Sequence, residues 1–175
     1  ILDDEALTLL SLPQVQKNMA YLGEQQLSFD CQMPLDNRQT TEQLIQIIKK
    51  TPTLKCIINH SGFPPFNNKT QAFTLWQDNL KRLAEHNNIA IKCSGWEMIG
   101  RDYSTDFVSE IIHACLEVFP STNLMLASNF PLTLLSTSYQ NYWQTMDSIL
   151  TNEEKTALCC SNAKSWYKLE LTEPK

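Results

Sequence analysis

The sequence predicts an α/β fold in which helices cover a parallel β-sheet. Short apolar runs alternate along the chain with longer segments of helical periodicity, and this alternation is typical of parallel sheets. The short runs are almost continuously apolar, as expected of strands that are buried on both faces. With 175 residues, 42% hydrophobic and 19% charged, the chain is long and apolar enough to form one globular domain, expected over residues 1–175.

The expected elements follow one another in a regular order. The first twenty or so residues have a helical pattern that breaks near Pro13. Four strand–helix units come next, with strands expected at 27–33, 54–60, 89–95 and 123–128. The helices between and after them are expected at about 41–50, 71–86, 104–119 and 139–150, where apolar residues recur every three or four positions.

The last helical region is predicted from a capping pattern. Thr151 and Glu154 stand three residues apart, the spacing of a capping box that opens a helix. Four strand–helix units form either an open doubly wound sheet or half of an eight-unit barrel, which typically needs about 250 residues.

Charge and motifs exclude several classes of function. The net charge of −5 and the pI of about 5.2 argue against nucleic acid as a partner. No apolar run is long enough for a membrane span, and no stretch resembles a signal peptide. The glycine motifs of dinucleotide-binding proteins, P-loop proteins and serine hydrolases are absent, so these three functions have no motif here. The expected partner is a small-molecule substrate.

The six cysteines are expected to be reduced. Cys31, Cys56, Cys93 and Cys115 lie inside apolar runs, and no C-x-x-C motif occurs. Small buried thiols are typical of proteins in a reducing compartment, so a cytoplasmic location is expected.

Polar residues gather where the expected strands end. In both candidate architectures ligands bind at the carboxyl ends of the strands. Because side chains alternate along each strand, we expect six polar residues to lie together at the carboxyl ends of the strands. These are Asp30, Gln32, His60, Lys92, Ser94 and Asn129.

Three of the candidate residues leave alternatives open. His60 is either a functional group or a hydrogen-bonded loop residue. Lys92 in an apolar strand either pairs with Asp30 or binds an anionic ligand. Trp96, together with Phe63, either lines a substrate pocket or simply packs.

The sequence does not predict a metal site of its own. It contains three histidines but neither H-x-H nor H-E-x-x-H, and only His60 lies where a ligand would be needed. A catalytic zinc usually takes three protein ligands.

Five segments, in order, resemble motifs of one hydrolase family: "LSFDCQM", "CIINHSGFPP", "IAIKCSGW", "LMLASNFPL" and "SNAKSWYKL". They look like the last four strands and the closing helix of amidohydrolase-related lactonases, the TIM-barrel family that includes fuconolactonase-like and dicarboxylate-lactone hydrolases. The resemblance implies that the chain is the C-terminal part, strands five to eight, of a (β/α)8 barrel. It also implies that the N-terminal half, with the H-x-H of strand one, lies upstream of Ile1.

The resemblance implies roles for the site residues. His60 matches the histidine that binds the substrate carbonyl or a metal, and Asn129 stands where the family has its general-base aspartate. Asp30, Gln32, Lys92, Ser94 and Trp96 are then the expected substrate-binding residues. The implied reaction is hydrolysis of a small sugar or carboxylated lactone by activated water, with a divalent metal such as zinc if upstream histidines are present.

The asparagine at position 129 leaves the enzyme's activity open. A neutral amide can hold a water molecule but cannot accept its proton. The alternatives are a non-catalytic descendant that kept the barrel, and a metal-dependent decarboxylase of the same superfamily. A half barrel also has two open sheet edges, which pair readily with other chains, so a homo-oligomer is a further expectation.

Overall fold

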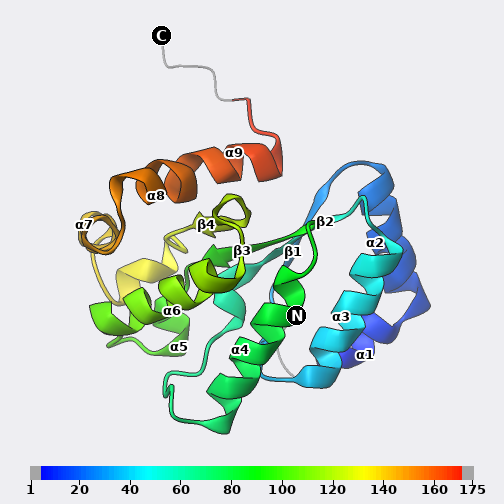
Figure 1. The fold of residues 1–175 in the computed structure, drawn as a ribbon, viewed down its shortest axis with the longest axis horizontal. Helices are drawn as coiled ribbons and strands as arrows, with labels where there is room; N and C mark the ends of the chain where they lie inside the picture. Colours follow the sequence, from blue (N-terminus) through cyan, green and yellow to red (C-terminus); the bar gives the residue numbers. More distant parts are fainter. Residues whose placement is uncertain (1–4, 171–175) are drawn as a thin grey trace.

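The computed structural model describes residues 5–170 and contains a four-stranded parallel sheet (Figure 1). The strands lie side by side in chain order: β1 (Ser28–Cys31), β2 (Lys55–Ile58), β3 (Ile89–Cys93) and β4 (Leu124–Leu126). Each strand pairs with the next, for example Phe29 with Cys56 and Ile91 with Leu124. This sequential parallel order is the order of strands in a TIM barrel, and it confirms the predicted α/β class.

Helices precede, separate and follow the strands as the sequence predicts. They are α1 (Glu5–Ser11), α2 (Pro13–Glu24), α3 (Arg38–Lys50), α4 (Gln71–Ala84), α5 (Trp96–Ile99), α6 (Thr105–Val118), α7 (Tyr139–Ile149), α8 (Asn152–Thr156) and α9 (Asn162–Tyr167). The helical break lies at Leu12, directly before Pro13, because proline fits the first turn of a helix and not its interior. The short helix α5 is not among the sequence predictions. No helix within residues 5–170 combines the length and the apolar character that crossing a lipid bilayer requires.

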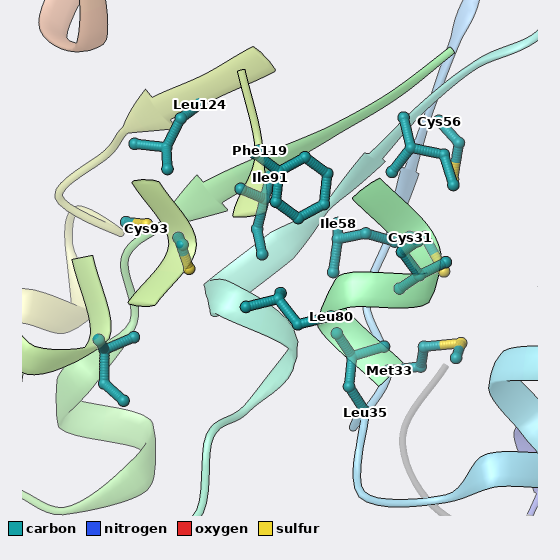
Figure 2. Packing of buried hydrophobic residues seen from close by; sticks show 14 of the residues in the cluster. Cys31, Met33, Leu35, Cys56, Ile58, Leu80, Ile91, Cys93, Phe119 and Leu124 are labelled. Carbon is teal, nitrogen blue, oxygen red and sulfur yellow. The ribbon is translucent and has the colours of Figure 1, made fainter. Parts of the chain in front are cut away.

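The main core lies between the sheet and the helices that follow the strands. Figure 2 shows the side chains of this face, among them Cys56, Ile58, Ile91 and Cys93, packed with Leu80 of α4. The contact with Cys31 and full burial raise the pKa of the Cys56 thiol, so it stays protonated and inert. The expectation of buried free thiols is confirmed for Cys31, Cys56, Cys93 and Cys115, whereas Cys159 and Cys160 are exposed.

The C-terminal helix α9 covers the opposite face of the sheet. Ile57, Ala90 and Met125 point to this face and pack against Trp166. The Asn162 side-chain amide donates to the Leu124 carbonyl at 2.7 Å, which ties α9 to the beginning of β4. Figure 1 shows α8 and α9 on the other side of the sheet from α4 and α6.

The capping box at α8 is present with both of its hydrogen bonds. The Thr151 hydroxyl accepts from the Glu154 amide, and the Glu154 carboxylate accepts from the Thr151 amide. Replacing Thr151 with alanine should lower the free energy of unfolding by about 1 kcal/mol, measured by urea denaturation. Thr156→Ala in the same helix is the control. An equal effect of the two substitutions would contradict the assignment of the cap.

Candidate active site

His60 leaves the strand through a left-handed turn. Strand β2 ends at Ile58, and His60 and Ser61 have φ values of 54° and 51°. Simple alternation would place His60 on the face of Cys56 and Ile58, which packs against the helices, so the alternation argument is wrong for this residue. The turn instead brings the His60 Nδ1 atom to 3.0 Å from the Ser94 hydroxyl oxygen at the end of β3.

Gly95 allows this close approach. A Cβ atom at position 95 would lie 2.3 Å from the His60 Nδ1 atom, and the φ of Gly95 is 73°, a value that favours glycine. Replacing Gly95 with alanine should therefore displace the imidazole and lower the free energy of unfolding by at least about 1 kcal/mol. The check is urea denaturation together with the NMR shifts of the His60 ring. Gly100→Ala is the control, since a Cβ there would meet only the Phe66 ring, at 3.3 Å. An unmoved His60 resonance in Gly95→Ala would refute the prediction.

The His60 imidazole is neutral near pH 7. Its side chain is only 7% exposed. Burial lowers the pKa of His60, and the nearby Lys92 ammonium lowers it further, while Asp30 and Ser94 oppose the shift. A neutral ring has one donor and one acceptor nitrogen. With Nδ1 engaged by Ser94, Nε2 is the nitrogen that can meet a ligand.

The lowered pKa of His60 predicts a pH dependence of stability. The unfolded chain takes up a proton near the ordinary value of 6.5, at a pH where the folded imidazole is still neutral. The free energy of unfolding should therefore be highest above pH 6.5 and should fall as the pH decreases below it. Denaturation at a series of pH values should show this slope in the parent and in His113→Asn, and a smaller slope in His60→Asn. Equal slopes in all three proteins would exclude His60 as the cause.

Lys92 is paired with Asp30 in the structure. Its ammonium lies 2.7 Å from the Asp30 carboxylate and 5.4 Å from the centre of the Tyr167 ring. The Tyr167 hydroxyl donates to the other carboxylate oxygen at 2.7 Å. Of the two alternatives for Lys92, the structure shows the pair. Sequence reasoning missed Tyr167 because it joins the group from a helix 137 residues further along the chain.

Asn129 contacts a buried carboxylate. It follows β4 in the left-handed conformation, with φ 55°, and its side-chain amide donates to Glu97 Oε1 at 2.5 Å. Glu97 lies on α5 and is only 6% exposed. Sequence reasoning missed Glu97, because a helix of four residues is too short to show a periodicity. The available signal was an acidic side chain three positions after Ser94.

The remaining candidates are Trp96, Phe63 and Gln32. Trp96 has 0% exposure and packs edge-on against Phe107, with ring centres 6.5 Å apart, so it lies in the core and does not line an open pocket. Phe63 packs instead against His60, with ring centres 5.3 Å apart. Gln32 follows the end of β1 and is half-buried.

Unpartnered buried atoms concentrate at the carboxyl ends of the strands. In residues 5–170, the buried side-chain atoms without a hydrogen-bond partner are Asn59 Oδ1, Ser61 Oγ, Trp96 Nε1, Glu97 Oε2, Thr133 Oγ1 and Ser136 Oγ. All belong to the segments that follow β2, β3 and β4. Four of the six described non-glycine residues with a left-handed backbone lie there too, at His60, Ser61, Phe63 and Asn129, and the others are Gln26 and Lys168. Strained backbone and unsatisfied polar groups are typical of functional sites.

The described residues do not by themselves form a metal site. Between residues 5 and 170, no three His, Cys, Asp or Glu side chains lie together in a way that could hold a metal ion. His60 is one imidazole donor, and a catalytic zinc takes three protein ligands.

Comparison with known proteins supports this fold. A family model described as "Amidohydrolase" matches residues 2–169. The chain is 26% identical over 175 residues to protein y4mH of Sinorhizobium fredii, covering 95% of this chain and 57% of that protein. It therefore spans little more than half the length of this relative.

Solved structures share the same architecture. A zinc-bound amidohydrolase of Burkholderia multivorans superimposes with a TM-score of 0.82 at 19% identity, over 96% of this chain and 62% of the other. A putative 2-pyrone-4,6-dicarboxylic acid hydrolase of Pseudomonas putida gives a TM-score of 0.75 at 18% identity, over 94% and 60%. A 2,6-dihydroxybenzoate decarboxylase is more distant, with a TM-score of 0.54. The predicted partial TIM barrel is thereby confirmed.

Proposed function

Because this chain belongs to the amidohydrolase family, we propose that it hydrolyses a small carboxylated or sugar lactone with an activated water molecule. The observation that carries the proposal is the concentration of unpartnered buried polar atoms and left-handed backbone after β2, β3 and β4. TIM-barrel enzymes have their active sites at this end of the strands.

His60 is the electrophilic group in this proposal. Its neutral imidazole, oriented through Nδ1 by Ser94, can donate a hydrogen bond from Nε2 to the lactone carbonyl oxygen. That bond strengthens as negative charge develops on the oxygen in the transition state. Gln32 and Lys92 contact the polar groups of the substrate, and Asp30 acts through its ion pair with Lys92. Asn129 contacts the attacking water.

A carboxylated lactone is the proposed substrate class. The Pseudomonas putida neighbour is described as a putative hydrolase of a pyrone dicarboxylic acid, which is a lactone that carries carboxylates. In the reaction water adds to the ring carbonyl carbon, the ring C–O bond breaks, and the product is a hydroxy acid. Lys92, held in place by Asp30, is the cation that can donate a hydrogen bond to a substrate carboxylate in this proposal.

The proposal concerns the native polypeptide that carries this sequence. The described sheet has open edges at β1 and β4, and we propose that the other half of a barrel, encoded upstream, closes them. A second copy of the chain is the other candidate for pairing with these edges. Buried free thiols at Cys31, Cys56, Cys93 and Cys115 favour a reducing location such as the cytoplasm.

The test has two steps. The intact mass of the native polypeptide is measured first, and the full protein is then assayed by pH-stat against a panel of carboxylated and sugar lactones. We expect a mass well above 20.1 kDa and turnover of at least one lactone above the uncatalysed rate. A mass near 20.1 kDa with no turnover would refute the proposal.

A non-catalytic descendant is the second candidate. The amide Asn129 favours it, because it stands where the family pattern has a carboxylate. This candidate predicts ligand binding without turnover in the parent. One fold neighbour is named as a decarboxylase. A decarboxylase would instead release carbon dioxide, which can be measured when hydroxybenzoates are added to the same panel.

A further inference from the structure

We infer that Glu97 is the general base of the site, replacing the aspartate that the family pattern places at position 129, and that Asn129 positions it. The inference rests on the proposed lactone hydrolysis. It names a residue that neither the motifs nor the comparisons mark.

Glu97 offers one free carboxylate oxygen in a buried position. Its side chain is 6% exposed, its Oε1 atom accepts from the Asn129 amide at 2.5 Å, and its Oε2 atom has no partner among the described residues. A buried carboxylate oxygen without a donor lacks a hydrogen bond that a water molecule can supply. A bound water there would lie beside both Glu97 and Asn129.

The segment that carries Glu97 also carries the partner of His60. Ser94 hydrogen-bonds the imidazole, Gly95 packs against it, and α5 begins at the next residue. The segment after β3 therefore carries both Glu97 and Ser94, the residue that orients the imidazole.

The identity of residue 129 is consistent with a carboxylate at position 97. An aspartate at 129 would place two carboxylates in direct contact, and two such groups cannot both ionise. An asparagine instead donates to Glu97 Oε1 and adds no second carboxylate. Asn129 thus takes the place of the aspartate in the family pattern and also orients Glu97 as the base.

Glu97 Oε2 accepts one proton from water as the water oxygen bonds to the lactone carbonyl carbon. The ring C–O bond then breaks, and the proton passes from Glu97 to the departing ring oxygen, which becomes the product hydroxyl. The step consumes one lactone and one water and gives one hydroxy acid, with no oxidant or reductant.

The parent and three variants of the native polypeptide test the inference: Glu97→Gln, Asn129→Asp and the double variant Glu97→Gln/Asn129→Asp. Glu97→Gln should lower kcat about 10²–10⁴-fold, the usual cost of losing a general base. The double variant moves the carboxylate to position 129 and should recover at least about tenfold over Glu97→Gln. Asn129→Asp should be slower than the parent at neutral pH, with the acid limb of its pH–rate profile moved to higher pH.

The control is Glu117→Gln on the exposed face of α6, which should leave kcat and the pH profile unchanged. Parent activity that survives Glu97→Gln would overturn the inference and leave the proposed function standing. An inactive parent with an active Asn129→Asp variant would overturn the inference and support a non-catalytic descendant. Inactivity of the parent and of all three variants on every lactone would count against the function and the inference together.

A readout without turnover separates a base from a structural glutamate. The infrared difference spectrum between the parent and Glu97→Gln should contain an ionised carboxylate band at pH 7, and Asn129→Leu should shift that band. A protonated carboxyl band at pH 7 would overturn the inference whatever the assays show.

Discussion

Replacing Trp76 with alanine is expected to lower the free energy of unfolding by about 3–5 kcal/mol. The indole has 0% exposure and packs on Phe73, with ring centres 5.1 Å apart. Its Nε1 atom donates to the Ser61 carbonyl at 2.8 Å, within the turn that carries His60. The substitution therefore empties a large core volume and removes the hydrogen bond that holds the turn.

Two further variants make this test specific. Trp76→Phe keeps much of the ring volume and loses the hydrogen bond, so it should cost clearly less than alanine and should still disturb His60. Trp143→Ala, in a half-buried position of α7, is the size-matched control and should cost less than Trp76→Ala. Urea denaturation gives the free energies and the His60 ring shifts report on the turn. Equal losses at positions 76 and 143 would contradict the account.

Replacing His60 with glutamine is expected to lower kcat for lactone hydrolysis about 10²–10³-fold in the native polypeptide. The glutamine side chain retains a donor, but it cannot keep both the contact with Ser94 and the position of Nε2. Because a donor aimed at the developing oxyanion acts mainly in the transition state, KM should change less than kcat.

The matched control for His60 is His113→Gln. His113 lies on α6, exposed, and its Nδ1 atom contacts the Ser109 carbonyl at 2.7 Å in the same helix. The substitution His113→Gln should leave kcat unchanged. Full activity of His60→Gln, or equal losses for the two histidines, would remove His60 from the proposed mechanism.

The fold was predictable because its elements are long or strongly patterned. The apolar stripe predicted helix α6 at 104–119, and the helix is found at Thr105–Val118. The strands were predicted too long. His60 and Gly95 were included in predicted strands, but at both residues the backbone is left-handed and has already left the sheet. Local sequence does not show where a left-handed turn ends a strand.

The candidate site was predictable in location but not in its contacts. Parallel strands bring their carboxyl ends together, so His60, Ser94 and Asn129 were sought in one region, and the structure joins His60 to Ser94. The partners found at Glu97 and Tyr167 depend on tertiary packing, since one lies on a four-residue helix and the other comes from α9. Trp96 was expected to bind substrate because it follows a polar motif, but its side chain packs in the core.

The most direct test of the central claim is to follow the fate of isotopically labelled water. The native polypeptide is incubated with a carboxylated lactone in ¹⁸O-water, and the hydroxy acid product is analysed by mass spectrometry. The account predicts one labelled oxygen in the new carboxylate, formed at a rate that His60→Gln strongly reduces. Product that forms no faster than in the protein-free blank, or product without label in that carboxylate, would contradict it.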